Sequence, residues 1–218
     1  MRHVFVETNW LVGHAAPAHQ KIYAAVDLLR KANRGEVQLY LPSICIAECQ
    51  RPIREKFQVR LEADRVRRFL LWARANQIVD ADAEDVVRRT LDQMEGLVKR
   101  DLDQLGDLLR NLRNEHGLEI YSLTEEMLER CTNLSFLGLQ PFDQAILASI
   151  LVKAEMLRAS GIECFAFCEA DSDLQPWDKL GEPKEALVKL YDQAAIWVYQ
   201  DFLLQKPEMP EGWPGVNA

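Results

Sequence analysis

A short apolar strand that ends in polar residues constrains the fold of this chain more than any other stretch. Residues 3–6 have the composition of a buried strand, Glu7, Thr8 and Asn9 follow directly, and a second apolar stretch begins at Trp10. In open α/β sheets the ligand sites lie at the carboxyl edge of the strands, so a central strand that ends in an acid brings a carboxylate to that edge. For Glu7 alone, an acid that is merely solvated beyond a buried strand is the simpler explanation.

Strands and helices alternate along much of the chain. Further apolar runs of strand character are found at residues 37–41, 118–123 and 162–168. Segments with apolar residues at helical spacing separate these runs. The alternation predicts right-handed crossover connections and a parallel sheet, which is an α/β fold.

One stretch departs from this alternation. Residues 57–115 are expected to form a helical insertion or lid, because apolar residues recur there at helical intervals through one long helix or a helix pair. The apolar stripes of these helices favour a homodimer. After Pro183 the pattern predicts a last amphipathic helix that reaches about Leu204. We therefore expect one domain over residues 1–205 and a loose tail at 206–218, where three prolines occur.

The composition restricts the compartment and the partners. The chain has 218 residues and no apolar run as long as a membrane span, and its N-terminus lacks the pattern of a signal peptide. Its five cysteines are odd in number and are expected to be free, buried thiols. These features predict a cytoplasmic protein with no membrane contact. The net charge of −8 argues against a general nucleic-acid coat, so a nucleic-acid binder of this composition needs a local basic patch and metal ions.

One stretch, residues 51–68, is clearly basic. It contains seven basic residues against three acidic ones, and it begins with Arg51, Arg54, Lys56 and Arg60. One interpretation is a solvated helix face with mixed charges. The other is a patch that guides an anionic polymer, since the stretch directly follows the acid at position 48.

Acidic residues occur at the ends of predicted strands and at the starts of predicted helices. They are Glu7, Glu48, Asp143, Glu169, Asp171 and Asp173. Strand carboxyl ends and the following helix amino ends share one edge of a parallel sheet, so we expect these segments to point carboxylates into one crevice. Two unit charges about 4 Å apart repel by roughly 4 kcal/mol at an effective dielectric of 20, and a divalent cation relieves that repulsion. All-oxygen ligand sets suit Mg²⁺ or Mn²⁺, which can activate water against a phosphodiester.

Four segments around these acids resemble the four acidic motifs of the PIN-domain nucleases, in the family's order. They are residues 4–12, 42–48, 142–148 and 165–174. The resemblance implies a three-layer α/β/α sandwich with a central parallel sheet, to which the helical insertion is added. It also implies Mg²⁺- or Mn²⁺-dependent hydrolysis of phosphodiesters, most often in RNA. Many small bacterial members are VapC-type toxins, which implies an antitoxin-like protein as a partner.

The resemblance also implies roles for individual residues. The four acids of the family match Glu7, Glu48, Asp143 and Asp171, which would be catalytic and hold the metal, with Asp173 as a flanking ligand. Thr8 and Asn9 match the polar residues that usually follow the first acid. In the resulting hypothesis the chain is an endoribonuclease, and the RNA backbone is guided by Arg51, Arg54, Lys56 and Arg60.

Two departures from the family pattern support an alternative. The first acid is usually aspartate, and Glu7 lengthens the arm by one methylene, which matters in a metal site that tolerates displacements of about 0.5 Å. Glu169 stands where the family often has a hydroxyl residue. The alternative is a PIN-like domain with weak or no catalysis that serves as a nucleic-acid or protein interaction module. A phosphatase-like hydrolase would need aspartate in place of Glu7, and a dinucleotide-binding domain would need a glycine-rich turn after the first strand.

Overall fold

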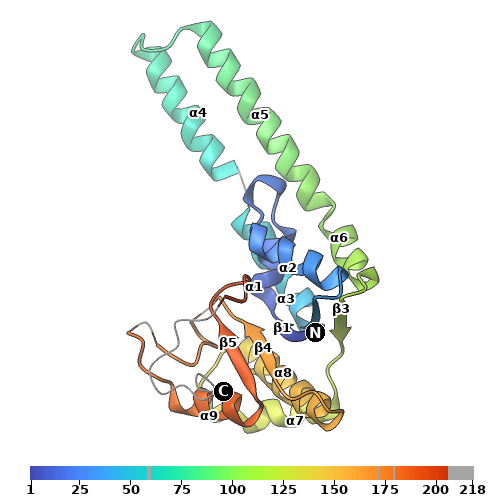
Figure 1. Ribbon diagram of the computed structural model, residues 1–218. Helices are drawn as coiled ribbons and strands as arrows, with labels where there is room; N and C mark the ends of the chain where they lie inside the picture. Colours follow the sequence, from blue (N-terminus) through green and yellow to red (C-terminus); the bar gives the residue numbers. More distant parts are fainter. Residues whose placement is uncertain (58–59, 171, 179, 206–218) are drawn as a thin grey trace.

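A five-stranded parallel sheet forms the centre of the molecule (Figure 1). The computed structural model describes residues 1–57, 60–170, 172–178 and 180–205, and for residues 60–62 it describes only the backbone. The strands are β1 (Arg2–Val6), β2 (Val37–Pro42), β3 (Leu118–Tyr121), β4 (Phe165–Cys168) and β5 (Ile196–Tyr199). They are ordered β3-β2-β1-β4-β5, and each neighbouring pair is parallel.

The strand order creates a topological switch point beside β1. From β1 the chain passes to β2 and β3 on one side, and it later crosses to β4 and β5 on the other. Strand β1 is therefore central, with Phe5 level with Tyr40 of β2 and Phe167 of β4. In such sheets the ligand crevice lies outside the carboxyl ends of the strands at the switch point. Here that place is where β1 ends at Val6 and β4 ends at Cys168.

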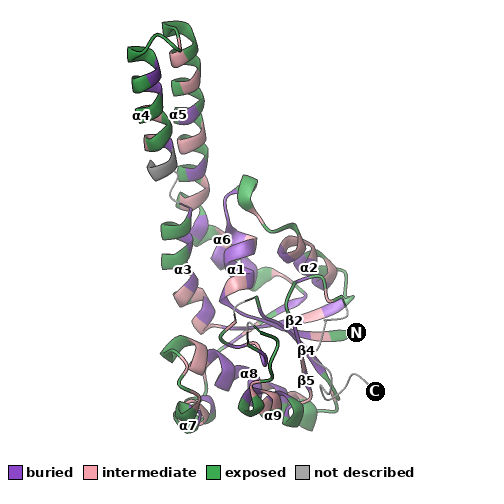
Figure 2. Cartoon of the chain, turned by 90° about the vertical axis from the view of Figure 1, so that its left-hand side faces the viewer, coloured by how far each residue is buried: buried purple, intermediate pink, exposed green. Residues whose placement is uncertain are grey.

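Helices cover both faces of the sheet and complete a three-layer α/β/α sandwich, as the sequence predicts (Figures 1 and 2). The helices of the body between β1 and β3 are α1 (Thr8–Ala15), α2 (Tyr23–Asn33), α3 (Ile44–Lys56) and α6 (Leu105–Asn111), with short 3₁₀ turns at Ala18–Gln20 and Leu112–Asn114. Those between β3 and β5 are α7 (Glu125–Asn133), α8 (Pro141–Ala159) and α9 (Glu185–Gln193), with a 3₁₀ turn at Ser135–Leu137. The chain moves along the sheet in one direction from β1 to β3 and in the opposite direction from β3 to β5. Because the crossovers are right-handed, the helices of these two parts cover opposite faces of the sheet.

Two long helices project from this body as an arm (Figures 1 and 2). The arm comprises α4 (Arg60–Ala75) and α5 (Ala81–Asp103), which contact each other and are joined by a short turn. Helix α5 is about 35 Å long at 1.5 Å per residue. The Asp80 side chain caps it by accepting a hydrogen bond from the backbone N–H of Ala83 at 2.8 Å. The predicted helical insertion is thus confirmed, and it is divided into α4, α5 and α6.

The sheet and the helices of the body share one apolar core. Phe5 on β1 and Phe167 on β4 are fully buried, and the ring of Phe167 lies 6.1 Å from that of Tyr191 on α9. Strands that are covered on both faces need apolar side chains at nearly every position. This requirement explains why the strands appear in the sequence as continuous apolar runs.

The prediction of one helix from Pro183 to Leu204 is wrong. Helix α9 ends at Gln193, Ala195 has a left-handed backbone with φ of 54°, and β5 follows. The four residues Ile196–Tyr199 are β-branched or aromatic, which favours a strand. Pairing with β4 buries three of them. The predicted tail, 206–218, lies outside the described residues.

The prediction of free, buried cysteines is confirmed in part. All five cysteines are free thiols; Cys45, Cys49 and Cys168 are buried, but Cys164 is exposed, contrary to the prediction that all would be buried. In the part of the chain that the structure describes, no helix is both long enough and apolar enough to cross a membrane.

Candidate functional site

Glu7 lies at the switch point and begins helix α1. It is the N-cap residue of α1, and only 4% of it is exposed. Both carboxylate oxygens accept hydrogen bonds from the backbone N–H of Asn9, at N···O distances of 2.8 Å. The free N–H groups of a helix N-terminus and the helix dipole stabilise negative charge at this place. Capping therefore holds the acid of the first motif at the carboxyl edge of the sheet.

The two polar residues after Glu7 connect it to two further glutamates. The Thr8 hydroxyl donates a hydrogen bond to the carboxylate of Glu48 on α3, and Asn9 Nδ2 donates to Glu169 Oε1 at 3.4 Å. Glu48 is half-buried and Glu169 is 1% exposed. The three glutamates come from the ends of β1 and β4 and from the second turn of the helix that follows β2. We call them the glutamate cluster.

Burial and the charges of the glutamate cluster together raise the pKa values of two thiols that the glutamates share as neighbours. Burial is the main cause that raises the pKa of Cys45, and the charges of Glu7 and Glu48 raise it further. Burial is also the main cause that raises the pKa of Cys168, to which Glu169 and Glu7 contribute. Glu7 therefore acts on both thiols, together with a different glutamate at each. The raised pKa values keep both thiols protonated at neutral pH, so they are neutral neighbours of the cluster.

The other predicted acids lie in different surroundings. Asp143 is half-buried in the first turn of α8. Asp173 is exposed and lines a cavity of about 430 Å³ together with Lys184, and none of the three glutamates lines that cavity. Asp171, the predicted fourth ligand, lies outside the described residues. Of the acids predicted from the sequence, the hydrogen bonds of Thr8 and Asn9 therefore group Glu48 and Glu169 with Glu7.

The donor atoms of the glutamate cluster suit a hard divalent cation. The cluster offers carboxylate oxygens beside one hydroxyl and one side-chain amide, and Mg²⁺ and Mn²⁺ prefer ligand sets made only of oxygen. Within the described ranges, however, no three histidine, cysteine or acidic side chains are arranged as a ready-made metal site. The chemistry of the donors thus fits the ion, but these residues do not form a complete coordination shell.

A basic pocket lies between α3 and α6. Its volume is about 230 Å³, and it is lined by Arg54, Arg110 and Arg113 above two buried leucines of α6. Arg110 forms an ion pair with Asp107. Among the residues that the structure describes, the side chains of Arg54 and Arg113 form no salt bridge and donate no hydrogen bond. Guanidinium groups with unused donors are suited to phosphate. We call this site the arginine pocket.

Two other basic residues named from the sequence, Arg51 and Lys56, do not line this pocket. Arg51 is exposed and pairs with Glu55 at 2.7 Å on its own helix. The Lys56 ammonium lies 5.7 Å from the ring centroid of Phe57. The side chain of Arg60 lies outside the described residues.

Sequence reasoning missed two features for different reasons. The first is Glu169, which is one of the acids at strand ends but is not a predicted metal ligand, because Asp171 matches the fourth motif better. The signal that identifies Glu7, a position directly after a buried strand, identifies Glu169 equally well. Arg113 carries no such signal, because its place beside Arg54 depends on how α6 packs against α3.

Comparisons with known proteins give no further assignment. No protein-family model matches this chain, and no characterised protein in the comparison is significantly similar to it in sequence. The resemblance to PIN-domain nucleases therefore rests on the four motifs, and membership of that family stays a prediction.

Proposed function

We propose that this chain is a metal-dependent phosphodiesterase that hydrolyses RNA. The glutamate cluster is the observation that carries the proposal, because Thr8 and Asn9 link Glu48 and Glu169, which come from separate segments, to the acid that follows β1 at the topological switch point of a parallel sheet. That is where α/β proteins of this kind bind ligands. The choice of RNA as substrate comes from the motif resemblance.

The residues of the cluster have separate roles in this proposal. Glu7, Glu48 and Glu169, together with Asp143, would hold Mg²⁺ or Mn²⁺. When bound, such an ion lowers the pKa of water and offsets negative charge on the phosphate. Thr8 orients Glu48 through its hydroxyl, and the amide of Asn9 does the same for Glu169. The motif adds Asp171 as the fourth acid and Asp173 as a flanking ligand, and both stay predictions from the sequence.

The arginine pocket supports an anionic substrate. Arg54 of α3 and Arg113 of the 3₁₀ turn after α6 line this pocket, whereas Glu48 of α3 accepts a hydrogen bond from Thr8 of α1. RNA whose scissile phosphate lies at the cluster could place a neighbouring phosphate in the pocket. In a chain of net charge −8, such a local patch is what nucleic-acid binding requires. The free thiols suit a cytoplasmic location, and an antitoxin-like partner stays a prediction from the resemblance.

The test is cleavage of single-stranded RNA in the presence of Mn²⁺ or Mg²⁺. We expect Glu48→Gln and Asp143→Asn each to reduce the rate about a hundredfold or more, since each removes a carboxylate that would hold the ion. Glu155→Gln is the matched control, because it makes the same kind of change at an exposed acid of α8 that pairs with Arg130. Equal rates for the wild type and both site variants would disprove the assignment.

One observation favours the alternative of a binding module without catalysis. Both oxygens of Glu7 are engaged with the N-terminus of its own helix, which is a structural role that needs no metal. If the wild type binds RNA with the same affinity in EDTA and in Mn²⁺, and cleaves nothing, the module is correct and the phosphodiesterase is not.

A further inference from the structure

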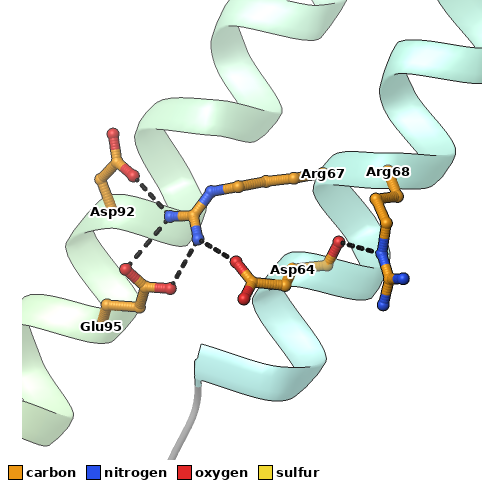
Figure 3. Close-up of polar contacts among 5 residues, drawn as sticks. All are labelled: Asp64, Arg67, Arg68, Asp92 and Glu95. Atoms are coloured by element: carbon orange, nitrogen blue, oxygen red, sulfur yellow. Dashed lines mark hydrogen bonds and ion pairs between the residues drawn. The ribbon is translucent and has the colours of Figure 1, made fainter.

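The arm has two flanks of different chemistry on either side of its own small core. The buried seam between α4 and α5 contains Leu91 and Val98. On one flank of this seam Arg67 crosses from α4 to Asp92 and Glu95 of α5, at distances of 2.9 and 2.8 Å (Figure 3). The charged side chains shown on this flank form ion pairs within one copy of the chain.

The opposite flank exposes a stripe of α5 residues that are three or four positions apart and therefore lie on one side of the helix. From the tip of the arm toward the body they are Asp82, Val86, Thr90, Gln93, Leu97 and Arg100. All six are exposed, and Val86 and Leu97 leave 63% and 54% of their surface in solvent. Neither Asp82 nor Arg100 forms a salt bridge with any described residue.

Two antiparallel copies of this stripe match each other around a two-fold axis close to position 91. Asp82 and Arg100 each lie nine residues from that position, so each acid would meet the partner's cation. Val86 and Leu97 lie five and six residues from it, so the two apolar side chains would meet. The polar Thr90 and Gln93 would meet near the axis. Every pairing is thus favourable in charge or polarity.

The residues of α4 on this flank agree with the same axis. The ion pairs of Arg67 with Asp92 and Glu95 fix the register of α4 against α5. In that register Phe69 is level with residues 90–93 of α5 and therefore lies beside the axis. Val66 and Trp72 then lie three residues on either side of Phe69 and would face each other across two copies. These side chains are 39% to 58% exposed, and the rings of Phe69 and Trp72 are 5.8 Å apart. The two helices therefore indicate one register independently.

We propose that this flank binds the same flank of a second copy of the chain, with the two arms antiparallel and α5 against α5. Standard interfaces bury roughly 800 Å² per partner. The rings of Phe69 and Trp72, together with an exposed α5 stripe that is about 27 Å long and contains Val86 and Leu97, supply much of such a surface. Among the described side chains of α4 and α5, the buried ones are Ala63, Leu70, Ala73, Leu91 and Val98, so pairing would enlarge a small core. This proposal does not depend on the proposed phosphodiesterase activity.

A charge-reversal series on the full-length chain tests the register, with sedimentation equilibrium as the measurement. We expect the wild type to be a dimer, and we expect Arg100→Asp and Asp82→Arg each to raise the dimer Kd about tenfold, because the two-fold symmetry places the altered contact in the dimer twice. The double variant with both reversals should restore the Kd to within about threefold of wild type. Leu97→Lys should weaken the dimer more than either single reversal, because it inserts a charge into the apolar layer.

Lys99→Asp is the matched control. It makes the same change of charge one residue from Arg100, but on the flank that bears Asp92, and it should leave the Kd unchanged. Circular dichroism at 222 nm should show equal helix content in all variants. A wild type that remains monomeric at about 100 µM would overturn the proposal, because a dimer with Kd below about 10 µM would be mostly formed there. So would a dimer in which Arg100→Asp and Lys99→Asp have equal effects, or one that the double variant does not restore.

Discussion

The α/β body and the arm use similar amphipathic helices, yet they bury their apolar residues to very different extents. In the body, the sheet and its helices share one continuous core. In the arm, three residues are buried in a separate cluster, while Phe69, Leu71, Trp72, Val86 and Leu97 are each more than half exposed. Large exposed apolar patches mark interaction surfaces. The difference indicates that the body has a continuous core, whereas the arm has only a small core of its own.

The largest expected effect separates the two cores. Phe167→Ala removes a fully buried ring beside Tyr191, and we expect the free energy of unfolding to fall by about 3–5 kcal/mol. Leu91→Ala removes an arm residue that is 8% exposed and has few buried neighbours, and we expect a loss of about 1–2 kcal/mol. Urea unfolding followed by tryptophan fluorescence would measure both. Equal losses would show that the arm and the body are not separate cores.

The second prediction concerns the junction between the body and the arm. His14 of α1 lines a cavity of about 410 Å³ with Asp101 of α5, and among the described residues its buried Nδ1 has no hydrogen-bond partner. Burial is the main cause that lowers its pKa from 6.5 to about 4; the Lys21 charge adds to this and Glu115 opposes it. Between these values the unfolded chain binds the proton more readily, so stability falls as the pH falls from 6.5 to 4, by roughly 2–3 kcal/mol in all.

The measurement for His14 is the free energy of unfolding as a function of pH. His14→Gln removes the titrating group and should flatten the curve between pH 4 and 6.5 relative to wild type. His19→Gln is the control, because His19 is exposed. If the wild type and His14→Gln have curves of the same slope over this range, the junction does not depend on a neutral histidine.

Local patterns predicted most of the fold and half of the site. The strands β1 to β4 could be found because each is an apolar run that a doubly covered sheet requires. Strand β5 could not, because the apolar spacing of α9 continues into it and only the backbone reversal at Ala195 separates the two. Glu7 was predictable from its position directly after β1, and Glu48 from its place near the start of the helix that follows β2. The arginine pocket was not predictable, because Arg54 and Arg113 are far apart in sequence and line one pocket only in the folded chain.

The third prediction compares arginines of the body with basic residues of the arm. We expect Arg54→Glu combined with Arg113→Glu to weaken RNA binding about tenfold or more and to reduce its salt dependence, because each removes a potential phosphate contact. The matched control combines Arg68→Glu with Lys99→Glu, which changes the net charge equally at two exposed positions of the arm. Fluorescence anisotropy with a labelled single-stranded RNA at several salt concentrations would measure both. A larger loss for the arm pair would move the RNA surface from the body to the arm.

The smallest effect is expected at the ion-paired flank of the arm. Arg67 joins α4 to α5 through Asp92 and Glu95 and also contacts Asp64 at 3.3 Å, but its side chain is 27% exposed, so solvent and salt screen these pairs (Figure 3). Arg67→Gln should speed amide hydrogen exchange in α4 and α5 at low ionic strength and leave exchange in β1 and β4 unchanged. In 1 M salt the difference between variant and wild type should shrink. If exchange in the sheet also accelerates, the arm and the body unfold as one unit. Faster exchange confined to the arm would instead show that the arm opens by itself, as expected for two helices with a small core.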